Sequence, residues 1–76
     1  MSINYKYANL IAHMVSEFNE KTKTYHLDFD QRQKLWDACK QCSVRTEERL
    51  GDVIERAYDF LATGMSVDEI DRRLNP

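Results

Sequence analysis

The sequence predicts an all-α protein, a compact bundle of three main helices and a short C-terminal helix. Apolar residues recur at spacings of three and four through most of the chain, and the strict alternation of a half-buried strand never occurs. Two glycines and one proline among 76 residues are too few for a turn-rich β fold. A chain of this length is expected to form one domain, residues 1–76, with a thin core.

The first helix is expected at about residues 4–21. Its apolar positions share one face at helical spacing: Tyr7, Leu10, Ile11, Met14, Val15 and Phe18. Tyr5, Ala8 and Ala12 widen this stripe beyond what one neighbouring helix needs, so the flank also predicts a homodimer. Residues 22–27 lack a helical period and are expected to connect the first helix to the second.

The second helix is expected to begin at one of two capping boxes and to end near Cys42. The boxes are Asp28 with Gln31 and Asp30 with Gln33. The expected inward residues are Leu35, Cys39 and Cys42, with Trp36 at the edge. Ser43 or Thr46 is expected to cap the third helix. Its expected inward residues are Leu50, Val53, Ile54, Ala57, Tyr58 and Leu61.

Two adjacent signals predict the end of the third helix and the start of the fourth. Gly64 can end the third helix in the left-handed conformation, which places Met65 against Phe60. Ser66 and Glu69 then form a capping box for a short helix. The expected inward residues of this helix are Val67, Ile70 and Leu74.

The segment from Ala57 to Asn75 resembles the first helix and turn of a helix-turn-helix unit. The resemblance rests on the spacing of Ala57, Leu61, Gly64, Ser66, Ile70 and Leu74. In that family the following helix enters the DNA major groove. The sequence stops at Pro76 before such a helix, and Asp71 stands where the family usually has a small apolar residue. We therefore expect a capped helical hairpin here, without the helix that reads DNA.

The overall charge argues against several classes of partner. Eleven basic and 13 acidic residues give a formal charge of −2, so nucleic acid is a less favoured partner than protein. No apolar run is long enough to span a membrane, and the N-terminus lacks the pattern of a secretory signal. Two cysteines do not make a disulfide scaffold. These features predict a cytoplasmic protein that does not bind membranes.

Four residues could in principle bind zinc: His13, His26, Cys39 and Cys42. His13 is expected on the polar face of its helix, and the cysteine pair lacks the turn glycines of a zinc knuckle. Packing of the two cysteines beside Leu35 is the favoured interpretation. No group of histidines, carboxylates and serines shares one expected face, so we expect neither a cofactor nor an enzymatic activity.

Two surfaces remain as candidate partner-binding sites. Like charges line the third helix at Glu48, Asp52, Glu55 and Asp59, which a basic groove on a partner would complement. Aromatic residues are typical interface anchors, and Tyr5, Tyr25 and Trp36 are the ones expected to face a partner.

These observations predict a non-catalytic protein-binding module, an inhibitor, adaptor or accessory subunit of a larger macromolecular machine. Small, acidic chains of this kind are common among regulators encoded by phages, and this comparison is an analogy between classes of protein. The alternative is a nucleic-acid-associated transcriptional regulator that uses the partial helix-turn-helix scaffold. Its dimer would present a basic face formed by Lys6, Lys21, Lys23, Arg72 and Arg73.

Overall fold

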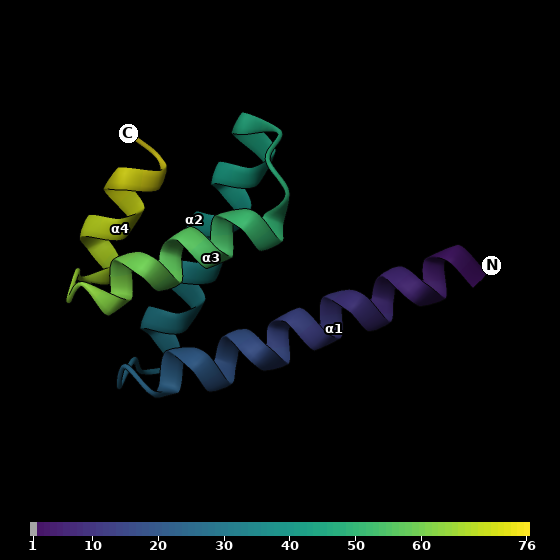
Figure 1. Ribbon diagram of the computed structural model, residues 1–76, viewed down its shortest axis with the longest axis horizontal. Helices are drawn as coiled ribbons and strands as arrows, with labels where there is room; N and C mark the ends of the chain where they lie inside the picture. The colour runs from purple at the N-terminus through teal and green to yellow at the C-terminus, as the bar shows by residue number, and fades with distance from the viewer. Residues whose placement is uncertain (1) are drawn as a thin grey trace.

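The computed structural model describes the backbone of residues 2–76 and the side chains of residues 9–76. Within this range the protein is all-α, which confirms the predicted class of three main helices and a short fourth. The helices are α1 (Ser2–Lys23), α2 (Phe29–Thr46), α3 (Leu50–Ala62) and α4 (Val67–Leu74). α2, α3 and α4 pack together as a body, and α1 lies along one side of it and extends past its edge (Figure 1).

The core lies where α2, α3 and α4 meet. The inward residues predicted for these three helices are buried, except Leu50, which is half-buried. α1 contributes two buried side chains from its C-terminal part, Phe18 and Thr22. Thr22 was expected in the connector, but α1 continues through it to Lys23. The Thr22 Oγ1 donates a hydrogen bond to the Phe18 carbonyl at 2.7 Å.

The apolar stripe of α1 is mostly uncovered. Leu10 is 58% exposed, Ile11 48% and Val15 36%, whereas Phe18 on the same stripe is 2% exposed. The reason is length, because α1 is longer than the body beside it (Figure 1). The radius of gyration is 12.6 Å, above the about 11.4 Å expected for 76 residues in a globular domain. The side chains of Tyr5 and Tyr7 fall outside the described residues.

The junction between α2 and α3 differs from the prediction. α2 runs to Thr46 instead of ending near Cys42, and α3 begins at Leu50 with Arg49 as an N-cap that makes no side-chain hydrogen bond. Thr46 does not cap α3 because it is the last residue of α2, where its hydroxyl donates to the Cys42 carbonyl at 2.7 Å and accepts from the Glu48 N–H at 3.4 Å. The Ser43 hydroxyl likewise donates, at 2.7 Å, to the carbonyl of Glu48.

The other predicted helix ends are present. Asp28 and Gln31 form the capping box of α2 with both hydrogen bonds, which selects Asp28 over Asp30 as the N-cap. Gly64 has φ +87°, and the Met65 N–H donates to the Phe60 carbonyl, as in a Schellman end. At α4 the Ser66 hydroxyl accepts from the Glu69 N–H at 3.2 Å, which is one of the two hydrogen bonds of the predicted capping box.

Side chains at both ends of α4 fix it to α2. Lys34 and Asp68 form an ion pair at its start, and the Arg45 guanidinium donates to the Leu74 carbonyl at its end. The Asn75 amide also donates to the Ala38 carbonyl at 3.1 Å. α4 is therefore held as a structural helix of the body.

Glu47 supplies a test of backbone strain at the end of α2. This exposed residue adopts the left-handed conformation with φ 61°, which costs a residue with a β-carbon about 1 kcal/mol or more. We expect Glu47→Gly to raise the free energy of unfolding by about 1 kcal/mol, measured by urea denaturation. Glu47→Ala is the control, since it removes the charge but keeps the β-carbon. Equal stability of the two variants would show that the backbone conformation is not the cause.

Candidate interaction surface

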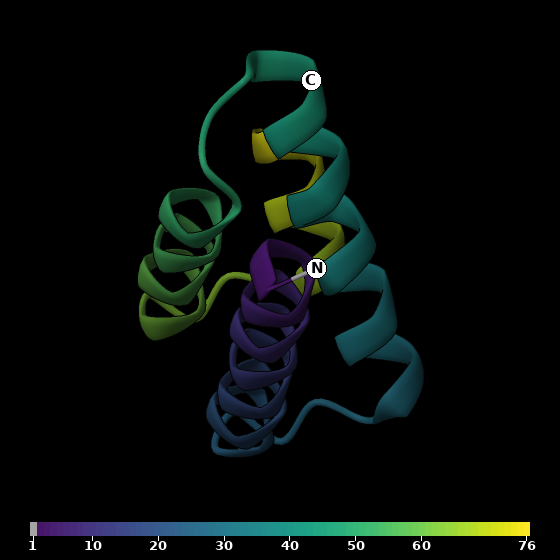
Figure 2. The ribbon, with the colours of Figure 1, turned by 90° about the vertical axis from the view of Figure 1, so that its right-hand side faces the viewer.

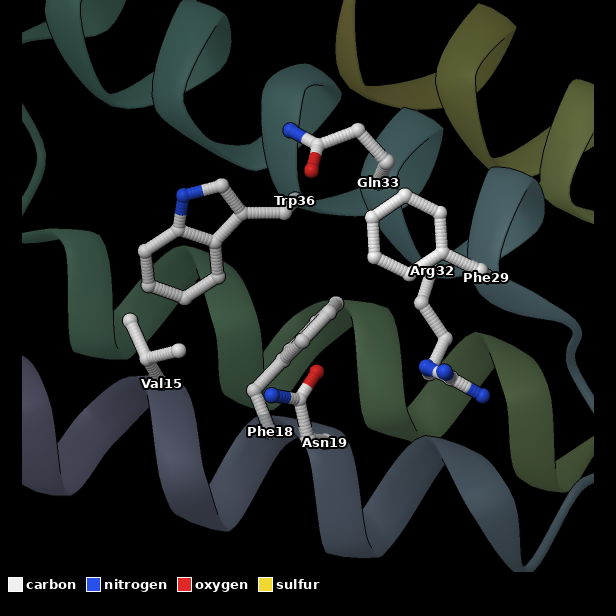
Figure 3. Close-up of a pocket in the computed structure, with 7 residues that line it drawn as sticks. All are labelled: Val15, Phe18, Asn19, Phe29, Arg32, Gln33 and Trp36. Atoms are coloured by element: carbon white, nitrogen blue, oxygen red, sulfur yellow. The ribbon is translucent and has the colours of Figure 1, made fainter.

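A groove of about 300 Å³ lies between the C-terminal half of α1 and the start of α2 (Figure 3). Its apolar part is formed by Val15, Phe18, Phe29 and Trp36. Phe29 is 68% exposed although it lines this groove. The volume is at the lower end of the range for ligand sites, so the groove suits one or two side chains better than a whole substrate.

Phe18 fixes the floor of the groove. Its ring meets Trp36 edge to face, with centroids 5.2 Å apart and planes at 66°. On its other side it stacks on Tyr58 of α3, with centroids 6.2 Å apart. Phe18 therefore contacts α2 and α3 at once, and the half-buried Trp36 is held by packing while it still borders the groove.

The groove continues into the uncovered stripe of α1. Ile11 lies one turn before Val15, and Leu10 lies beside it on the same helix. We call Leu10, Ile11, Val15 and Phe29 the α1–α2 apolar face. They are four of the five large hydrophobic residues that are exposed among the described side chains. The fifth, Val44, is 81% exposed near the opposite end of α2.

The other end of the groove is polar. Arg32 lies opposite Val15 across the groove, between Phe29 and Asn19, and Gln33 lies above them (Figure 3). Arg32 is half-buried, whereas all the other described basic residues are exposed. Its Nη1 donates to the Leu27 carbonyl at 2.8 Å, and among the described side chains no carboxylate lies within 4.0 Å of it.

The acidic stripe predicted on the third helix is shorter than expected. Glu48 precedes α3 and pairs with Arg56, so it lies outside the helix, and this ion pair lowers the pKa of its carboxyl. Asp52, Glu55 and Asp59 are on α3 and exposed. None of these three lies within 4.0 Å of a basic group among the described side chains.

The three aromatic residues predicted to face a partner have different positions. Tyr25 and Trp36 are half-buried and pack against the core, and Trp36 also lines the groove. The side chain of Tyr5 lies outside the described residues. Sequence reasoning missed Phe29 and Arg32. A usable signal for Phe29 was its position out of phase with the inward residues of α2.

The four candidate zinc ligands are not brought together. Cys39 and Cys42 are buried in the body, whereas His13 is exposed beside Glu17 and His26 is exposed in the connector with φ 61°. Within the described residues, no group of three or more histidine, cysteine, aspartate or glutamate side chains is arranged to hold a metal ion.

The basic residues of the alternative prediction lie at two ends of the molecule. Lys21 and Lys23 are in the last turn of α1, and Arg72 and Arg73 are in the last turn of α4. The C-terminal ends of these helices lie on opposite sides of the body in both ribbon views (Figures 1 and 2). The side chain of Lys6 is not described. One copy of the chain therefore does not gather the other four cations on one face.

No protein-family model, curated protein or solved structure matches this chain. Over the described residues, none of the helices is both long and apolar enough to cross a membrane.

Because both cysteines are buried, we expect their thiols to be protected from thiol reagents. Burial raises the pKa of Cys39 to about 12, with the nearby Cys42 adding to the effect, and the two residues are at most 1% exposed. We expect a disulfide reagent at pH 8 to label the native protein at least about a hundredfold more slowly than the urea-unfolded chain. A Val44→Cys variant should show one fast-reacting thiol. Equally fast labelling of the native wild-type cysteines would contradict this packing.

Tyr58 predicts a loss of stability at alkaline pH. Burial first, then the charges of Glu17 and Glu55, raise the pKa of Tyr58 to about 12 from the ordinary 10.0. The folded state retains the proton longer, so this contribution is full below pH 10 and is lost as pH rises from 10 through 12. Tyr58→Phe should flatten the fall of unfolding free energy in this range. Both proteins should carry Cys39→Ala, because the Cys39 thiol also loses its proton in this pH range. Equal slopes of unfolding free energy against pH with and without Tyr58→Phe would refute the prediction.

Proposed function

We propose that the protein is a non-catalytic protein-binding module, a small inhibitor, adaptor or accessory subunit that docks its partner on the α1–α2 apolar face. The observation that carries this proposal is the exposure of four large apolar residues: Val15 and Phe29 line the groove, and Leu10 and Ile11 lie about one turn before Val15 on α1. Exposed apolar residues that stand singly need no explanation, whereas a contiguous group beside a groove is typical of an interaction site.

The length of α1 supports the same proposal. The N-terminal part of this 22-residue helix extends beyond the body (Figure 1). An uncovered helical segment is marginal in water, because most helix stability in proteins comes from packing of the apolar face. A partner that covers Leu10 and Ile11 supplies that packing.

Aromatic residues at the groove and acidic residues on α3 would contribute in different ways. Trp36 and Phe29 offer large apolar area at low entropic cost, which is the chemistry of an affinity anchor. Asp52, Glu55 and Asp59 on α3 lie outside ion pairs and would act through longer-range attraction, on association rate and orientation.

The test is affinity capture from lysate of the source organism with three forms of the full-length chain. The wild type is compared with the double variant Leu10→Gln, Ile11→Gln and with Val44→Gln, which changes an equally apolar but distant exposed residue. We expect one protein to be captured by the wild type and Val44→Gln and reduced at least about tenfold with the double variant. Circular dichroism confirms that each variant keeps its helices.

Three outcomes oppose the proposal. A captured protein that the double variant retains places the interface elsewhere. Capture that disappears after nuclease treatment and falls steeply with salt favours the nucleic-acid alternative, because phosphate contacts release counterions. Self-association in sedimentation velocity that the double variant abolishes identifies the face as a homodimer interface instead of a site for another protein.

A further inference from the structure

We propose that the polar end of the groove receives a carboxylate from the partner protein, one helical turn away from an apolar side chain that fills the other end. This inference rests on the proposed function and adds the chemistry of the partner. The groove has two unlike ends, with Val15 and Trp36 at one and the Arg32 guanidinium at the other (Figure 3).

The state of Arg32 points to an anion. Half-burial removes part of its hydration, and among the described residues the Leu27 carbonyl alone accepts from it. A guanidinium has five N–H donors, so most of them are free for another acceptor. A partly desolvated arginine beside aromatic rings is the usual site for a two-point hydrogen bond with a carboxylate.

The other polar groups of the groove fit the same occupant. Among the described residues, the Asn19 side chain forms no hydrogen bond, and the Gln33 amide nitrogen donates to Asp37 at 3.2 Å. Asn19 can therefore donate to a carboxylate that reaches Arg32. Gln33 retains its carbonyl oxygen, which can accept from a backbone or side-chain N–H of the partner.

The distance between the apolar end and the polar end of the groove sets the distance between the two side chains that a partner would insert. Val15 and Asn19 are four residues apart on α1, which is about 6 Å along a helix. Arg32 and Trp36, at the two ends of the groove, are also four residues apart, on α2. A partner helix with an apolar residue and an aspartate or glutamate three or four positions away presents both groups on one face at this distance.

A displayed library of random 16-residue peptides, selected on the immobilised full-length chain, identifies such a segment. We expect the retained peptides to share an apolar residue and a carboxylate three or four positions apart. For the tightest peptide, replacing that carboxylate by its amide should weaken binding to the wild type about tenfold or more. The same replacement should have no effect on binding to Arg32→Gln, since the two changes remove one interaction.

Two further variants separate charge from folding. Arg32→Lys keeps the charge without the fork of donors and should recover part of the affinity lost in Arg32→Gln. Arg49→Gln removes an exposed cation outside the groove and should bind like the wild type. Melting curves of each variant show whether lost binding reflects lost structure.

The outcomes distinguish this inference from the proposed function. Peptides that lose affinity with the Leu10→Gln, Ile11→Gln variant but lack a carboxylate effect overturn the inference and leave the apolar docking face in place. An amide effect that persists in Arg32→Gln also overturns it. If no selected peptide responds to the Leu10→Gln, Ile11→Gln variant or to Phe29→Gln, both the inference and the docking face are wrong.

Discussion

The position of α1 depends on the insertion of Phe18 between Trp36 and Tyr58. Burial of one phenylalanine contributes about 2–3 kcal/mol, and each aromatic pair adds about 0.5–1.5 kcal/mol. Phe18 is the large fully buried side chain that α1 gives to the core. Because this contact lies in the C-terminal part of a 22-residue helix, it attaches that part of α1 and leaves the N-terminal part beyond the body (Figure 1). The groove, the exposed stripe and the placement of Arg32 all follow from that geometry.

The sequence was sufficient to predict the helices and most of the core. Apolar spacing identified the inward residues of α2, α3 and α4, because the burial pattern along a helix is a local property. The α2–α3 junction was predicted wrongly for a physical reason. Ser43 and Thr46 can cap a following helix or bond to backbone groups around them, and which they do depends on where α2 ends and α3 begins.

The candidate site could be predicted only in part. Spacing shows that α1 has an apolar face, but what covers that face depends on the length of the body beside it. The meeting of Val15 with Phe29 and Arg32 depends on the connector, where His26 adopts the left-handed conformation and reverses the chain. Composition does not encode that reversal. The edge position of Trp36 was predicted, since its place beside the inward residues of α2 is again a local property.

The charges on the two sides of α1 give the proposed interface a direction. α1 lies between α2 and α3 when it is viewed from near its N-terminal end (Figure 2). On the α3 side, Glu17 and Glu55 are close enough to Tyr58 to raise its pKa, and Lys21 lies over the Tyr58 ring. On the α2 side, the groove presents Arg32. A partner helix with an acidic and a basic edge would therefore bind in one orientation, because reversing it would place its carboxylates against Glu17 and Glu55. Apolar contacts alone would accept either orientation, so on this proposal the affinity comes from the apolar face and the choice of partner comes from its charged edges.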